Sequence, residues 1–131
     1  MFLDANIFIY AYAEPSQKGM HCAALLERVK NGQQNATTSG LVINEVLYFF
    51  ITHYSLDKVE KVHRSITSLE NLSILPVNDK VTVKAIDFIL QGMEITDAYH
   101  AATMSANHIE TICSYDTHFD SAKGIRRQAP K

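Results

Sequence analysis

Short β-prone runs alternate with helical segments along the whole chain, and this alternation is what most limits its fold. The β-prone runs lie around Phe2, Ala36, Ile74, Ile112 and Ile125. Between them, the spacing of apolar residues predicts helices at 5–13, 21–30, 41–54, 55–69, 80–91 and 97–107. Strands that alternate with helices form a parallel sheet covered on both faces. We therefore predict an α/β fold: a three-layer α/β/α sandwich around a central, mostly parallel sheet of four or five strands.

The composition suits one globular domain over residues 1–131. Of these residues, 47% are hydrophobic and 20% are charged, so folding can bury roughly two-thirds of the surface of the unfolded chain. No apolar run reaches the ~18 to 20 residues that cross a bilayer, and no basic segment precedes an apolar one at the start. We expect a cytoplasmic protein without a membrane partner. Cys22 and Cys113 lie in apolar surroundings without a Cys-x-x-Cys pair, which predicts buried free thiols.

Positive charge is concentrated at the C-terminal end. The formal net charge is −2, yet the last nine residues carry +4 and the preceding 122 carry −6. The four cations of this tail are Lys123, Arg126, Arg127 and Lys131. Such a tail is either a solvated terminus or a contact for phosphate groups, and the sequence leaves both interpretations open.

Two aspartates directly follow predicted strands. Asp4 follows the apolar run that opens the chain, and Asp116 follows the run that ends at Tyr115. Ligand sites in open parallel sheets form at the carboxyl ends of strands, so we expect both carboxylates at one edge of the sheet. Local roles are also available, because Asp4 can cap the helix that begins at Ala5 and Asp116 can be a turn residue.

Two further acids lie in predicted helices. Glu45 is in the middle of the segment 41–54, which is apolar on every side and should be largely buried. Burying a lone ionised carboxylate is costly, so Glu45 should protonate, pair or bind a metal, unless the helix exposes a narrow edge. Asp97 is predicted to open the helix 97–107 behind Thr96 as N-cap, where the helix dipole alone would favour an acid.

Four acids that converge on one pocket would repel one another unless cations neutralise them. Oxygen ligands select Mg²⁺ or Mn²⁺ over zinc, so we predict a site for one or two such ions. The catalytic and metal-ligating candidates are Asp4, Glu45, Asp97 and Asp116. Ions held there would activate a water and stabilise the oxygens of an in-line phosphoryl displacement. Asn6, Thr96 and Ser114 could orient metal-bound water from a second layer.

Four sequence blocks, taken in order, resemble the signature blocks of PIN-domain ribonucleases of the VapC toxin type. The blocks are Phe-Leu-Asp-Ala-Asn-Ile-Phe at 2–8, Ile-Asn-Glu-Val at 43–46, Thr-Asp-Ala-Tyr-His-Ala-Ala at 96–102 and Ser-Tyr-Asp-Thr-His-Phe-Asp at 114–120. They span the whole chain. The resemblance implies an α/β/α sandwich with a central parallel sheet and an endoribonuclease site that depends on Mg²⁺ or Mn²⁺.

The resemblance also implies roles for particular residues and partners for the protein. The family's acidic positions fall on Asp4, Glu45, Asp97 and Asp116. Asn6 matches the usual polar neighbour, and Asp120 matches a further acid of some members, so we treat Asp120 as auxiliary. The family implies RNA as substrate, a homodimer, and a small antitoxin that wraps the toxin and obstructs its acidic site.

Other functions remain as alternatives. A PIN-like module without activity would bind RNA or protein. Its sequence signature would be the loss of one or more of the four acids, and all four are present. A Mg²⁺-dependent phosphatase with an aspartyl nucleophile would want a second Asp at the position of Asn6, and would give Glu45 no role. Paired histidines could cleave RNA without metal, but their spacing gives no support. We expect only His100 near the pocket, in a packing or hydrogen-bonding role.

Overall fold

The computed structural model describes residues 1–13 and 15–131. In these residues the strands are β1 (Phe2–Leu3), β2 (Ala36–Ser39), β3 (Leu72–Leu75), β4 (Thr111–Cys113) and β5 (Arg126–Gln128). The α-helices are α1 (Ala5–Tyr12), α2 (Gln17–Lys30), α3 (Gly40–His53), α4 (Leu56–Thr67), α5 (Asp79–Leu90) and α6 (Ile95–Ala106). A 3-10 helix, η1 (Thr117–Ser121), follows β4.

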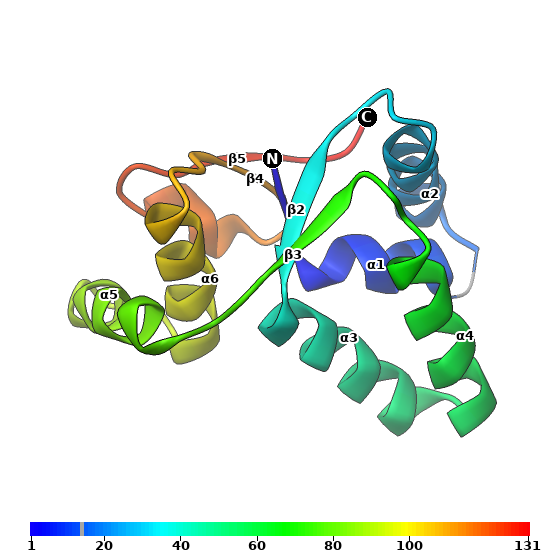
Figure 1. The fold of residues 1–131 in the computed structure, drawn as a ribbon, viewed down its shortest axis with the longest axis horizontal. Helices are drawn as coiled ribbons and strands as arrows, with labels where there is room; N and C mark the ends of the chain where they lie inside the picture. The colour runs from blue at the N-terminus through cyan, green and yellow to red at the C-terminus, as the bar shows by residue number, and fades with distance from the viewer. Residues whose placement is uncertain (14) are drawn as a thin grey trace.

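The strands form one parallel sheet in the order β3-β2-β1-β4-β5. Helices α1 to α4 lie on one side of the strands, and α5 and α6 lie on the other (Figure 1). The predicted α/β fold, with helices on both sides of a parallel sheet, is confirmed. The last β-prone run, predicted around Ile125, is the strand β5 one residue further on.

The central strand β1 lies at the point where the strand order reverses. From β1 the chain continues to β2 on one side, whereas from β4 it continues to β5 on the other. The connections after β1 and β4 therefore diverge, which opens a crevice at the carboxyl ends of these two strands. The register pairs Leu3 with Cys113, so the residues that follow, Asp4 and Ser114, arrive side by side at this crevice.

Three further helices begin at capping side chains. Ser39 caps α3, Ser55 caps α4 and Asn78 caps α5, each by accepting a backbone N–H of the first turn. The prediction for α6 was wrong. Glu94 is the N-cap residue, without a side-chain cap bond, and Thr96 is already the second helical residue. Helix α2 starts four residues earlier than predicted because Ser16 caps it.

The main core joins the sheet to α1, α2, α3 and α4. Fully buried aromatic and aliphatic side chains fill it, among them Phe2, Leu3, Phe8, Val46 and Phe50. A smaller cluster of Val81, Ala85 and Ala102 joins α5 to α6. Cys22 and Cys113 are free and buried, as predicted, and burial raises the pKa of their thiols to about 11 and about 12.

Helix α3 is less buried than its composition predicted. Val42, Val46 and Phe50 form one buried stripe, whereas Tyr48 is 67% exposed and Ile51 is 53% exposed. A helix packed on one side needs only one apolar stripe, so the rest of its apolar surface faces outward. The expectation of a helix buried on every side is therefore wrong.

Within the residues that the structure describes, none of the helices has both the length and the apolar character that a bilayer crossing requires.

Candidate functional site

The carboxylate of Asp4 is held by three donors at the carboxyl end of β1. The backbone N–H of Asp4 donates to the carbonyl of Cys113, which brings Ser114 against it. Ser114 Oγ donates to Asp4 Oδ2 at 2.5 Å, and Asn6 Nδ2 donates to the same oxygen at 2.6 Å. The Ala5 N–H donates to Oδ1 at 2.7 Å, so Asp4 also caps α1 as the sequence allowed.

Ser114 links the two strand-end aspartates. Its Oγ accepts the backbone N–H of Asp116 at 2.9 Å while donating to Asp4. Asn6 strengthens the link, because its Nδ2 donates to Ser114 Oγ at 2.9 Å and its Oδ1 accepts the Tyr115 N–H. Both side chains predicted as neighbours of the acids thus fix the geometry of the strand ends.

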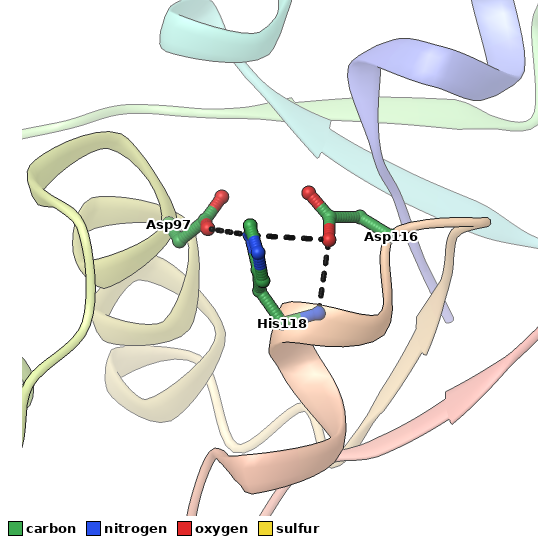
Figure 2. A group of neighbouring side chains, drawn as sticks. All are labelled: Asp97, Asp116 and His118. Atoms are coloured by element: carbon green, nitrogen blue, oxygen red, sulfur yellow. Dashed lines mark hydrogen bonds and ion pairs between the residues drawn. The ribbon is translucent and has the colours of Figure 1, made fainter.

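Asp97 and Asp116 face each other across the crevice, with His118 between them (Figure 2). Asp97 comes from the first turn of α6, and Asp116 caps η1 by accepting the His118 N–H at 2.9 Å. One ligand atom from each of the three side chains lies within 4.8 Å of the other two. A pocket of about 170 Å³ opens beside Asp97 and His118.

Glu45 reaches the site from α3 and is paired with a buried histidine. His100 Nε2 lies 2.6 Å from Glu45 Oε2, and the exposed fractions of the two side chains are 1% and 34%. Glu45 is therefore only partly buried, which agrees with the alternative that the helix exposes a narrow edge there. His100 Nδ1 has no hydrogen-bond partner in the described part of the chain. The prediction that His100 lies near the pocket in a hydrogen-bonding role is confirmed.

The four acids form one cluster in which the charge of one acid affects the pKa of another. Burial is the largest cause that raises the pKa of Asp4, and the charge of Glu45 adds to it. Burial also raises the pKa of Asp97 most, followed by the charge of Asp116 and then that of Asp4. Ser114 and His100 act in the opposite direction on Asp4. The charged forms of Asp4 and Asp97 are thus disfavoured, and a bound cation would compensate for this.

Two predicted auxiliary residues are arranged differently. Thr96 lines a neighbouring apolar pocket with Leu41, Ile95 and Tyr99, and among the described residues no hydrogen bond joins its side chain to the acids. Asp120 pairs with Arg127 through two bonds of 2.8 and 2.9 Å, which lowers the pKa of Asp120. Arg127 also donates to the Ser114 carbonyl at 3.2 Å, so Asp120 holds an arginine against β4.

His118 is the member of the cluster that the sequence did not single out. It lies in the block Ser114–Asp120, two residues after Asp116, but only His100 was expected near the pocket. The sequence signal that could have indicated it is a histidine two residues after a strand-end aspartate. A residue at that spacing turns back beside the acid only because Asp116 caps a 3-10 helix, which the sequence did not predict.

The donors in this cluster suit a divalent cation. They are carboxylate oxygens, which are ligands of Mg²⁺ and Mn²⁺, and one imidazole nitrogen, which is a ligand of first-row transition ions. Burial and repulsion between acids raise the pKa of Asp4 and Asp97, and a bound cation would offset both effects. Asp97 and Asp116 could hold such an ion directly, with Asp4 and Glu45 beside it.

Comparison with known proteins agrees with this arrangement. The sequence profile of the PIN domain matches residues 1–125. The chain belongs to the PIN domain family. The resemblance seen in the four sequence blocks is thus confirmed, and this PIN domain carries the expected acidic cluster.

Several relatives of this PIN domain are toxins. It is 25% identical to ribonuclease VapC13 of Mycobacterium tuberculosis over 131 residues, which cover 98% of this chain and 99% of that one. The structure of Mycobacterium tuberculosis VapC20, described as a toxin that cleaves the sarcin-ricin loop, superposes with a TM-score of 0.76 at 13% identity. That match covers 93% of this chain and 94% of VapC20. A toxin-antitoxin complex from Klebsiella pneumoniae gives 0.70 at 16% identity, covering 95% and 94%.

The raised pKa of Asp97 predicts a pH-dependent stability of the PIN domain in chelator. The folded pKa lies above the usual 3.8, so the folded state binds more protons than the unfolded state between these two values. Asp97 therefore lowers the free energy of unfolding as pH rises through this interval, and the penalty is complete above the folded pKa. We expect Asp97→Asn to stabilise the protein more at pH 7 than at pH 4, measured by urea unfolding.

Asp57→Asn is the matched control, because Asp57 is an exposed first-turn aspartate of α4 and reports the helix-dipole contribution. If Asp97→Asn changes the free energy of unfolding by the same amount at both pH values, the raised pKa of Asp97 is not the cause of the change.

Proposed function

We propose that this PIN domain is a metal-dependent endoribonuclease of the VapC type and the toxin of a toxin-antitoxin pair. The observation that carries the proposal is the convergence of four acids from β1, α3, α6 and η1 at the crevice between β1 and β4. Full-length similarity to ribonuclease VapC13 supports the reaction class. The proposed substrate is RNA, which makes the cytoplasm the expected site of action.

The proposed roles follow from where each side chain lies. Asp97 and Asp116 would hold Mg²⁺ or Mn²⁺, with Asp4 and Glu45 completing the ligands directly or through water. Such an ion would polarise the scissile phosphate and lower the pKa of an attacking water. Ser114 and Asn6 keep the Asp4 carboxylate in one orientation by donating to Oδ2.

The C-terminal cations offer a contact for the RNA backbone. Arg127 is already engaged by Asp120, and Arg126 pairs only loosely with Glu110 at 3.9 Å. Arg126 opens β5 opposite Thr111, toward the amino end of β4, so it could contact RNA away from the acids. Exposed cations attract phosphate groups through a salt-dependent charge interaction. We therefore assign backbone contact to Lys123 and Arg126, and a structural role to Arg127.

An antitoxin partner follows from the likeness to toxin-antitoxin complexes such as that from Klebsiella pneumoniae. A nuclease that cleaves cellular RNA needs an inhibitor until its activity is required. We propose a small protein that covers the acidic crevice. Growth arrest on expression of this chain alone is the observation that tests this partner.

A second copy of the chain is the proposed occupant of the exposed face of α3. Tyr48 and Ile51 continue, at helical spacing, a surface that begins in the pocket of about 470 Å³ lined by Leu41, Ile95 and Thr96. A contiguous exposed apolar surface of this kind marks an interaction site. It borders the acidic crevice, so a homodimer would bring two active sites close together.

Chelation is the decisive test of the metal-dependent reaction. We expect cleavage of structured RNA in Mg²⁺ or Mn²⁺ to stop in excess EDTA and to return when the ion is restored, since the acids cannot neutralise one another. Product formation is followed on end-labelled RNA. Cleavage that survives chelation would contradict the metal mechanism, and RNA binding without cleavage under all conditions would favour the silent binding module.

A further inference from the structure

His118 is held in the site although it has no packing role. Its side chain is 71% exposed, whereas those of Asp97 and Asp116 are 15% and 36% exposed. Its backbone N–H donates to Asp116 Oδ1, and the buried neighbour Phe119 anchors η1 in the core. The backbone thus presents the imidazole to the two carboxylates (Figure 2). Most of the surface of this side chain is nevertheless exposed.

The distances around His118 Nδ1 distinguish between two kinds of contact. Nδ1 lies 3.3 Å from Asp116 Oδ1 and 3.5 Å from Asp97 Oδ2. Both separations exceed the roughly 2.7 to 3.2 Å of a good N–H···O bond. They suit neighbouring ligands of one cation, because two atoms at right angles and about 2.1 Å from an ion are about 3.0 Å apart, and wider angles increase this separation.

We propose that His118 Nδ1 is a direct ligand of the catalytic cation, and that it makes the site prefer a first-row transition ion such as Mn²⁺ over Mg²⁺. This inference rests on the proposed metal-dependent function. Imidazole nitrogen binds first-row transition ions well, whereas Mg²⁺ is a hard ion that favours oxygen ligands and water. One nitrogen among carboxylate oxygens therefore raises affinity for Mn²⁺ more than affinity for Mg²⁺.

The competing role for His118 is a contact to substrate that involves no metal bond. In that case the imidazole would affect RNA cleavage but leave the affinity for both ions unchanged. A measurement of metal binding in the absence of RNA separates the two roles.

Mn²⁺ binding to the purified full chain tests the inference by electron paramagnetic resonance. Free Mn²⁺ is titrated to give its dissociation constant, and Mg²⁺ is titrated in competition. We expect His118→Ala to weaken Mn²⁺ binding about tenfold or more and Mg²⁺ binding by less than about threefold. Electron spin echo modulation of bound Mn²⁺ should show coupling to an imidazole ¹⁴N that is lost in the variant.

His63→Ala is the matched control, because His63 is an exposed histidine of α4. It should keep both the affinity and the ¹⁴N coupling. Bound Mn²⁺ without ¹⁴N coupling, coupling that persists in His118→Ala, or an equal loss of affinity for both ions would overturn the role of His118 while leaving the nuclease function intact. Absence of any Mn²⁺ or Mg²⁺ binding would overturn the proposed function as well.

Discussion

Asp4→Asn is expected to lower the rate of RNA cleavage by about 10²-fold or more. The substitution keeps the shape of the side chain but removes one of the four negative charges of the acidic cluster. It also replaces one carboxylate oxygen by an amide NH₂ group, which donates hydrogen bonds. Both carboxylate oxygens of Asp4 accept hydrogen bonds, so one of these contacts loses its acceptor. The fold should persist, because burial disfavours the charged form of Asp4 and the variant has no charge to bury.

Single-turnover cleavage of end-labelled RNA measures this effect, with Asp57→Asn as a charge-matched exposed control. The same pair tests the toxin role, since expression of the unsubstituted chain should arrest growth and expression of Asp4→Asn should not. Cleavage by Asp4→Asn at the normal rate would contradict a role for the acidic cluster. A chain that cleaves RNA in solution but never affects growth would contradict the toxin role alone.

Tyr48→Asp combined with Ile51→Asp is expected to weaken self-association by about 10³-fold or more. Two buried charges at the centre of an apolar interface each cost about 2 kcal/mol of association free energy or more. The free energy of unfolding should change little, because the two side chains are 67% and 53% exposed. Light scattering over a range of protein concentrations gives the dissociation constant.

Met20→Asp controls for the added charge, because Met20 is 64% exposed on α2 and lies outside the proposed dimer surface. This variant should associate like the unsubstituted protein. A dimer that persists in the Tyr48 and Ile51 double variant, or an unsubstituted chain that is monomeric throughout, would contradict the assigned surface.

The acids at the two strand ends could be anticipated from the sequence because of strand topology. An aspartate that directly follows a buried parallel strand must emerge at the carboxyl edge of the sheet, wherever the strand lies. The positions of Asp4 and Asp116 could therefore be predicted from the strands alone. The helix caps Ser39, Ser55 and Asn78 are also predictable from local sequence, because a cap depends on residues three or four positions apart.

Contacts between residues that are far apart in the sequence could not be predicted in this way. The partner of Glu45 is His100, 55 residues away, and composition alone suggested that α3 was buried on every side. Which stripe of an apolar helix faces the core depends on the neighbours it packs against. The exposed Tyr48 and Ile51 therefore appeared only in the structure, and with them the proposed dimer surface.

The sequence by itself determined the α/β alternation and indicated the four candidate acids, because these follow from local periodicity and from residue type. The tertiary structure alone decided how the acids are arranged. It paired Asp120 with Arg127, moved Thr96 to a neighbouring pocket, and brought His118 between Asp97 and Asp116. The physical reason is that a site made from four separate segments is defined by distances between them, which depend on packing and not on any one segment.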